Sequence, residues 1–521
     1  MARARKPGDD ALPPTRGPTD TPLYALLTAR RFRLGASTER VARNLALHGG
    51  AVAGDAAAWI GAARPPEDAP SVGLGSFAGT LGPRSFGFVN VHGQVAAFDA
   101  PLPSLPRAGG LGLVVPARDA LPDVAPLALA RGLGLSWIVS VGDGDPAETL
   151  AFLTADLMTS ALGVVLGPGA TGASLRSVLG AKPTVVWGGD ALARAVARRA
   201  GAVVVDGGLG SFLAHVQLYD AGVEPGAAVE VIVVGGGRAY VDDEVRAAAL
   251  EARVVAVDER APEELDAAIA VAAAAQKPVV LVAGTMPSEL ARAVQSGGAQ
   301  LLSADLRHPE HLRALLVALA APVAESESGR TRPRIDKELA ARVRYESDGV
   351  LSDHDAKRIL KAYGARVTRQ APTNTPTGAV KLAKQIGVPC LVAIPGDERV
   401  ADSMADVKRI AALMLGEAPS IMVRERFPEV PRVRIKVAPE KGLGATMRVG
   451  SACALVPLTR ADGLALAAAT PARRAADQRA VAELLGKISA CAADEDVTFD
   501  LELFVGAEPC VLAAAGEIRR R

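Results

Sequence analysis

Residues 136–166 read SWIVSVGDGDPAETLAFLTADLMTSALGVVL. The apolar runs at residues 136–141 and 163–166 lack period-2 alternation, which is typical of strands covered on both faces. Between them, residues 147–159 follow a Gly/Asp/Pro-rich turn and have the length and pattern of a helix. The segment therefore predicts a strand–helix–strand unit of a parallel sheet.

The same alternation extends on both sides of this unit. The further predicted strands are residues 110–115, 183–187, 229–234, 253–257, 278–282 and 300–302, and the further predicted helices include residues 173–179 and 191–199. Because the rhythm stops after residues 183–199 and restarts at residue 229, we predict two doubly wound parallel-sheet domains.

Composition limits the functions that the chain can have. It has 521 residues, 49% hydrophobic and 22% charged, so it can bury several cores. Lys and Arg number 58 against 57 Asp and Glu, and aromatic residues make up 3%, which argues against a nucleic-acid partner. No apolar run reaches the roughly 18 residues of a membrane span. The four cysteines lack metal-site spacing, so we expect reduced thiols in a cytoplasmic protein.

The last third of the chain has a different organisation. Residues 325–336 (ESESGRTRPRID) are polar and predict an interdomain linker. Ser352 and Asp355 then resemble a capping box at the start of a helix, and Gly364 is placed to end it. Beyond residue 364, strand and helix patterns are mixed, which predicts an α+β domain.

Four segments, in this order, resemble the fused NDP-forming acyl-CoA synthetases, relatives of succinyl-CoA ligase. They are residues 34–37 (LGAS) with 41–49, residues 82–90 (GPRSFGFVN), residues 136–143 (SWIVSVGD), and residues 351–364 (LSDHDAKRILKAYG) with the closing strand at 500–505 (DLELFV). The resemblance implies an α/β multidomain chain. Its parts would be a truncated Rossmann-like CoA-binding domain with most inner strands missing, two flavodoxin-like domains and a C-terminal ATP-grasp-like α+β domain.

These segments set the expected domain boundaries. We expect a disordered tail at residues 1–22, the truncated CoA-binding domain at 23–108, a flavodoxin-like succinyl-CoA ligase-type domain at 109–226, a second flavodoxin-like domain at 227–322, a linker at 323–345 and a reduced ATP-grasp-like domain at 346–521.

The resemblance also implies binding residues. For CoA they are Gly35, Ala36, Ser37, Gly82, Pro83 and Asn90. A glycine turn at a helix N-terminus lets backbone N–H groups approach a phosphate, although the same residues also form plain turns and caps, and Asn90 can bond its own turn.

For ATP, the resemblance places Arg424 and Glu425 beside the adenine through their backbone groups. Asp500 and Glu502 would bind Mg²⁺, for which carboxylates are competent ligands. Two alternating acids on a strand are also a common polar face, so this alternative stays open.

Several groups that the reaction of the family needs are missing. The position of the family's phosphohistidine falls on Val205, beside Asp206, and the phosphate-binding lysine falls on Ala393. An acid of the family is replaced by Arg434, and its orienting glutamate falls near Gly167. Loss of a covalent nucleophile normally lowers the rate by orders of magnitude.

We therefore predict a divergent acyl-CoA synthetase-like protein that binds CoA or an acyl-CoA, and ATP with Mg²⁺. It would be catalytically impaired and would regulate or scaffold an intact synthetase subunit or a second copy of itself, without a membrane or nucleic-acid partner. The alternative is an active ADP-forming ligase that joins a carboxylic acid to CoA.

Overall fold

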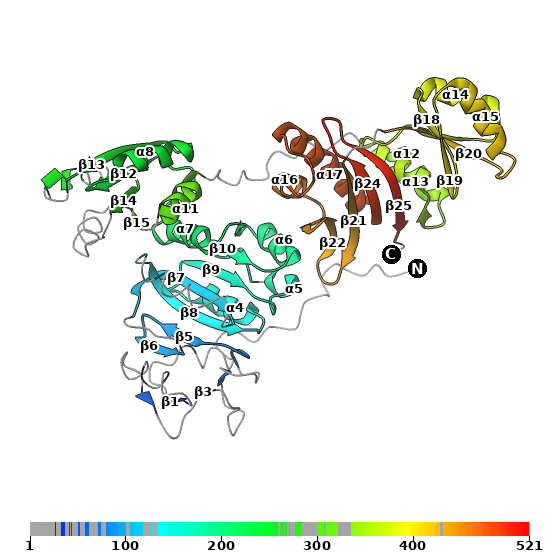
Figure 1. Cartoon of the computed structure of the whole chain (residues 1–521). Coiled ribbons are helices and arrows are strands. Elements are labelled where there is room, and N and C mark those ends of the chain that lie inside the picture. The colour runs from blue at the N-terminus through cyan, green and yellow to red at the C-terminus, as the bar shows by residue number, and fades with distance from the viewer. Residues whose placement is uncertain are drawn as a thin grey trace. The chain divides into compact units, whose positions relative to one another are not determined.

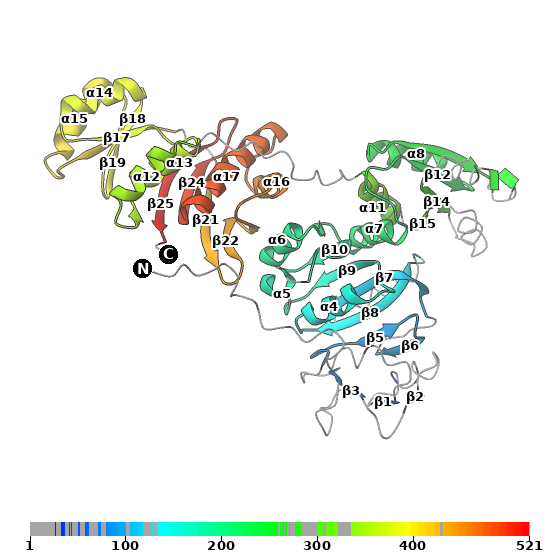
Figure 2. The same ribbon diagram turned by 180° about the vertical axis from the view of Figure 1, so that it is seen from behind.

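The computed structural model of the chain divides into two compact units, Met1–Glu325 and Ser326–Arg521 (Figures 1 and 2). It describes most of residues 80–117 and 131–258, then 277–283, 300–305 and 309–320, and residues 335–519 apart from 428–430. Before residue 80 it describes four short strands and a few single residues, and the predicted tail at 1–22 lies outside the described residues.

A small parallel sheet occupies the first part of the N-terminal unit. Its order is β2-β1-β3-β4, with β1 at Arg33–Ala36, β2 at Ala51–Val52, β3 at Ala58–Gly61 and β4 at Ser71–Gly73. The expectation that most inner strands are missing is therefore wrong. Strands of two to four residues are too short to show a hydrophobic period, so the sequence pattern does not reveal them.

A seven-stranded sheet follows, in the order β11-β10-β9-β7-β8-β5-β6. Its strands are β5 (Gly87–Asn90), β6 (Val95–Phe98), β7 (Arg107–Pro116), β8 (Gly134–Gly142), β9 (Ala161–Leu166), β10 (Thr184–Gly188) and β11 (Val203–Val205), and its helices are α4 (Ala147–Ala155), α5 (Gly172–Arg176), α6 (Ala191–Arg199) and α7 (Leu209–Asp220). The strands from β7 to β11 are parallel, as predicted. Helix α4 ends four residues early, because the backbone becomes extended at its C-cap Asp156 (ψ 123°). The carboxylate of Asp156 accepts hydrogen bonds there from Trp137 Nε1 (2.9 Å) and Thr159 Oγ1 (2.7 Å).

The segment that resembles the end of a CoA-binding domain belongs to this second sheet. Strands β5 and β6 form a hairpin, and β5 pairs antiparallel with β8. The tight approach of the hairpin requires glycine at Gly87, where φ is +94° and a Cβ would lie 1.9 Å from the Ala97 carbonyl oxygen.

A third sheet completes the N-terminal unit. All its strands are parallel in the order β13-β12-β14-β15, with β12 at Val229–Val234, β13 at Ala252–Val257, β14 at Val279–Ala283 and β15 at Leu301–Asp305. Helices α8 (Arg238–Ala247) and α11 (Pro309–Ala320) accompany it. Leu218 of α7 and Leu315 of α11 belong to one hydrophobic core with these strands, so α7 joins the second and third sheets.

The C-terminal unit is built on two antiparallel sheets. The six-stranded sheet has the order β16-β25-β24-β21-β22-β23, and the four-stranded sheet has the order β17-β20-β18-β19. The strands are β16 (Val350–Leu351), β17 (Gln370–Thr373), β18 (Cys390–Ile394), β19 (Asp397–Ala401), β20 (Ile421–Glu425), β21 (Arg432–Glu440), β22 (Gly444–Val449), β23 (Ala452–Leu455), β24 (Val497–Phe504) and β25 (Cys510–Ile518). The helices are α12 (Lys337–Glu346), α13 (Asp353–Ala362), α14 (Pro376–Ile386), α15 (Met404–Met414), α16 (Arg460–Ala468) and α17 (Ala475–Glu495).

Helix α13 starts and ends where the sequence predicts. Ser352 Oγ accepts a hydrogen bond from Asp355 N (3.1 Å), as in a capping box. It also donates one to the Asp355 carboxylate (2.7 Å), so a bond between the two side chains takes the place of the second, backbone bond of a capping box. Gly364 has a φ of +73° just after the last turn, as a C-terminal cap requires. The general α/β class is confirmed, and none of the described helices is long and apolar enough to cross a membrane.

The core of the C-terminal unit lies between the six-stranded sheet and α17. Phe499 of β24 is 2% exposed and shares this core with Leu485 and Ile488 of α17.

We predict that Phe499→Ala lowers the free energy of unfolding of this unit by about 3–5 kcal/mol. Since all three tryptophans lie in the N-terminal unit, denaturation followed by circular dichroism should show a shifted transition that tryptophan fluorescence does not.

The control for this prediction is Thr498→Ala, which truncates the neighbouring residue on the half-exposed face of the same strand. A Thr498→Ala effect as large as that of Phe499→Ala would contradict the assignment of the core face.

Candidate functional site

The half-exposed face of the six-stranded sheet carries two acids and two arginines. Buried and half-exposed residues alternate along β24, and Asp500 and Glu502 fall on the half-exposed face. On the neighbouring strand β21, Arg432 and Arg434 are on the exposed positions of the same alternation. Their register places the two pairs of residues side by side, because Arg434 lies opposite Glu502.

Each acid forms an ion pair with one of these arginines. Arg434 donates from Nε to Asp500 Oδ1 (2.8 Å) and from Nη2 to Asp500 Oδ2 (2.5 Å). Arg432 Nη1 donates to Glu502 Oε1 at 3.3 Å. The hydrogen bonds from Arg434 hold the pKa of Asp500 below its usual range, against a smaller effect of burial, so this carboxylate is ionised at neutral pH.

A pocket of about 780 Å³ lies over this face. On the other side of β24, Ala515 lies opposite Asp500 and Ala513 opposite Glu502. These alanines leave open the space that larger side chains would fill. The volume is within the range of pockets that hold small-molecule ligands, roughly 300–1,000 Å³.

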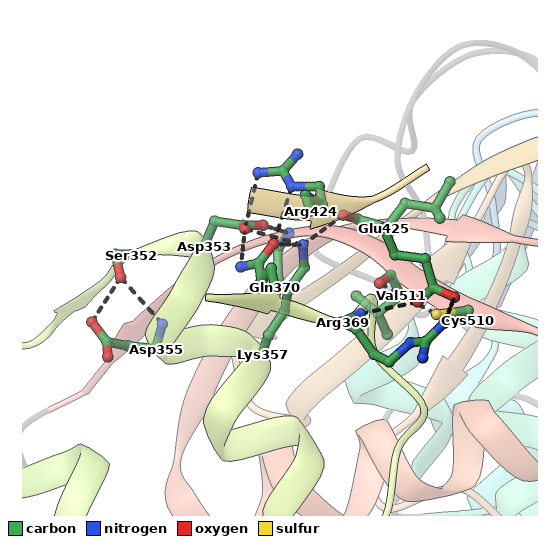
Figure 3. A network of polar contacts seen from close by, with 12 residues as sticks. Ser352, Asp353, Asp355, Lys357, Arg369, Gln370, Arg424, Glu425, Cys510 and Val511 are labelled. Atoms are coloured by element: carbon green, nitrogen blue, oxygen red, sulfur yellow. Dashed lines mark hydrogen bonds and ion pairs between the residues drawn. The ribbon is translucent and has the colours of Figure 1, made fainter. Parts of the chain in front are cut away.

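Asp353 and Arg424 form the rest of the polar lining. Asp353 is the first residue of α13, and its Oδ1 accepts a hydrogen bond from Ala514 N of β25 (2.8 Å). Its Oδ2 accepts from Lys357 Nζ at 3.0 Å. Arg424 of β20 approaches the same oxygen at 3.4 Å and donates to Gln370 Oε1 at 3.1 Å (Figure 3).

Lys357 is the centre of this network although its side chain is only 3% exposed. Its ammonium donates to Asp353, to Gln370 Oε1 (2.9 Å) and to the Leu512 carbonyl (2.6 Å). Burial lowers the pKa of Lys357 to about 8, with the charge of Asp353 opposing this effect. Burial raises the pKa of Asp353, but the charge of Lys357 and the hydrogen bonds outweigh it, so the net pKa is below the usual value.

The structure brings together three of the four residues that the sequence assigns to ATP and Mg²⁺. Arg424, Asp500 and Glu502 line the same pocket. Glu425 does not, because its carboxylate binds the Arg369 guanidinium (3.0 Å) and the Arg369 backbone N–H (3.1 Å), away from Asp353 (Figure 3). Ala393, to which the resemblance assigns the position of the phosphate-binding lysine, lies in β18 and is buried.

Of the residues assigned to CoA, those that lie in strands belong to two different sheets. Gly35 and Ala36 are the last residues of β1, inside the strand and not in a turn after it, and Ser37 lies outside the described residues. Asn90 ends β5, and its Oδ1 accepts a hydrogen bond from Gly93 N (2.8 Å), so it bonds its own turn.

Gly82 and Pro83 lie at the end of strand β8. The Pro83 carbonyl accepts a hydrogen bond from Asp143 N (2.9 Å), and Arg84 donates to both oxygens of the Asp143 carboxylate. Through the hydrogen bond from Arg84, the pKa of Asp143 is lowered. The segment is therefore tied to the carboxyl end of the seven-stranded sheet.

The resemblance assigns the phosphohistidine position to Val205, beside Asp206. Val205 ends β11 and is buried in the core, while Asp206 is exposed and forms an ion pair with Arg194 (2.9 Å). His215, further along α7, is bonded through Nδ1 to the Ser211 carbonyl of its own helix (2.9 Å).

Sequence reasoning missed Asp353, Lys357 and Arg432 as site residues. A signal for Arg432 was present, because RVRIK at residues 432–436 alternates basic and apolar residues and so predicts one cationic face of a strand. Asp353 and Lys357 have helical spacing of four residues, which by itself indicates only a surface ion pair.

No family model matches the sequence, and no curated protein matches it. Similar solved structures include a dinucleotide-forming acetyl-coenzyme A synthetase 1 of Ca. Korarchaeum cryptofilum, in complex with coenzyme A (18% identity, 35% of this chain and 100% of that chain, TM-score 0.32). PH1788 of Pyrococcus horikoshii is 20% identical, and the match covers 36% of this chain and 100% of PH1788 with a TM-score of 0.32. PH0766 of the same organism is 13% identical, and the match covers 55% of this chain and 96% of PH0766 with a TM-score of 0.40.

The lowered pKa of Lys357 predicts a pH dependence of stability. Between pH 8 and 10.5 the unfolded chain keeps the lysine proton that the folded chain has released. The free energy of unfolding therefore increases with pH across this range because of this group. The difference in free energy of unfolding between the wild type and Lys357→Met should therefore increase across this range in urea titrations.

The control is Lys361→Met, which changes an exposed lysine on the same helix. A difference between wild type and Lys357→Met that stays flat from pH 8 upward would show that Lys357 titrates as an ordinary lysine.

Proposed function

We propose that this chain is a divergent acyl-CoA synthetase-like protein that binds nucleotide in its C-terminal unit and CoA or an acyl-CoA in its N-terminal unit, and that it has lost the ligase reaction. The observation that carries the nucleotide site is the pocket of about 780 Å³ whose lining includes Arg424, Arg432 and Arg434. Guanidinium groups suit phosphate because their N–H donors match two phosphate oxygens at once.

Loss of catalysis is supported by the position of the missing nucleophile. The buried side chain of Val205 has no atom that can accept a phosphoryl group, and the neighbouring Asp206 is exposed and paired with Arg194. The lysine that the reaction of the family places on the phosphates is Ala393 here. A protein with these changes retains binding surfaces without the chemistry that couples them.

CoA binding is supported by the position of Gly35 and Ala36. They end β1, an inner strand of a parallel sheet, and open α/β sheets bind ligands beyond the carboxyl ends of such strands. The role that follows is regulation or scaffolding, with an intact synthetase subunit or a second copy of the chain as the partner.

The loss of catalysis predicts no turnover. Purified full-length protein mixed with ATP, Mg²⁺, CoA and a panel of short and aryl carboxylates should form neither ADP nor thioester above the protein-free rate. Thioester formation that disappears in Glu502→Gln would instead show an active ADP-forming ligase.

Each ligand should stabilise a different unit. At about 100 times its dissociation constant, a ligand stabilises the folded state by roughly 2.7 kcal/mol. CoA should therefore raise the midpoint of the tryptophan fluorescence transition, since Trp59, Trp137 and Trp187 lie in the N-terminal unit. ATP should raise the circular dichroism transition of the other unit. If neither ligand moved either transition, the proposal would fail.

A further inference from the structure

The family resemblance implies Mg²⁺ beside the nucleotide, and the residues present do not fit this ion. Mg²⁺ binds carboxylate oxygens at roughly 2.0–2.1 Å and demands near-ideal octahedral geometry. Both oxygens of Asp500 already accept hydrogen bonds from Arg434. Each oxygen has a second lone pair, but a cation bound there would lie beside the guanidinium of Arg434, whose positive charge repels it.

The other two carboxylates of the pocket are also paired with cations. Glu502 contacts Arg432, and Asp353 contacts Lys357 and Arg424. Among the residues that the structure describes, no group of three or more His, Cys, Asp or Glu side chains is placed to hold a metal ion. The acids of this pocket thus balance arginine and lysine charges.

Arg432 and Arg434 keep N–H donors for a ligand although each is paired with an acid. A guanidinium has five N–H donors, and Arg434 uses Nε and Nη2 on Asp500. The Arg434 side chain is 79% exposed and that of Arg432 is 49% exposed, so solvent and solutes reach both. Lys436, which lies opposite Asp500 on β21, adds a further positive charge beside the pocket.

We propose that the pocket binds the polyphosphate of a nucleotide through Arg424, Arg432 and Arg434, without Mg²⁺. Asp500 and Glu502 are then positioning residues, which hold the two arginines of β21 on the face of the sheet, and are not metal ligands. This inference rests on the proposed nucleotide site and deepens it by stating how the charge of the phosphates is neutralised.

The direct test is calorimetric titration of the full-length protein with ATP and with inorganic tripolyphosphate, each in EDTA and in excess Mg²⁺. We expect binding in EDTA that is at least as tight as in Mg²⁺, because the free polyphosphate carries more charge for the arginines. Binding that occurs only in Mg²⁺ would overturn the inference and leave the nucleotide site intact. Absence of binding in both buffers would overturn the proposed nucleotide site as well.

Variants separate the two roles of the acids. Glu502→Gln keeps an oxygen that can accept the hydrogen bond from Arg432 and removes a negative charge beside the phosphates. A positioning role therefore predicts several-fold tighter ATP binding in both buffers. A metal-ligand role predicts a loss of tenfold or more that is confined to the Mg²⁺ buffer, and that result would contradict us.

Arg434→Ala should weaken ATP binding at least tenfold in both buffers, with partial recovery in Arg434→Lys. The matched control is Arg448→Ala, which breaks an ion pair with Glu440 on the same sheet outside the pocket. An equal loss in Arg434→Ala and Arg448→Ala would show that only the general charge of the sheet matters.

Discussion

The pairing of β21 with β24 determines the character of the candidate site. Its register sets Arg434 opposite Glu502 and Lys436 opposite Asp500, so basic and acidic side chains share one face of the six-stranded sheet. Two ion pairs result, Arg434 with Asp500 and Arg432 with Glu502, so each acid is neutralised by an arginine. A shift of one residue would turn these charges into the core, where unpaired charges are strongly unfavourable. The same register therefore maintains the fold and decides which charges line the pocket.

A second constraint is the buried ammonium of Lys357. It connects the start of α13, strand β17 and strand β25 through Asp353, Gln370 and the Leu512 carbonyl. Because Gln370 and Asp353 also contact Arg424, the arginine on the four-stranded sheet is held against the edge of the six-stranded sheet. The wall of the pocket thus depends on a charge that is costly to bury and is satisfied by three acceptors.

Much of the fold could be predicted from the hydrophobic periodicity of the sequence, but the candidate site could not. Long runs such as residues 229–234 are strands with the predicted bounds, whereas the short strands β2 and β4 left no period to detect. The resemblance to acyl-CoA synthetases led to Arg424, Asp500 and Glu502, which do line one pocket. It did not reveal that each acid forms an ion pair with an arginine. These ion pairs depend on the pairing of β21 with β24, which are separated by about 60 residues of sequence. The replacement by Arg434 was visible in the sequence, but its contact with Asp500 was not.

The most direct measurement of the central claim is a crystal structure of the full-length protein grown with ATP and Mn²⁺, whose anomalous scattering marks a bound cation. We predict phosphate oxygens within hydrogen-bond distance of Arg424, Arg432 or Arg434, and no anomalous peak between Asp500 and Glu502. A Mn²⁺ ion held by these two carboxylates, with Arg432 and Arg434 turned away, would contradict the account.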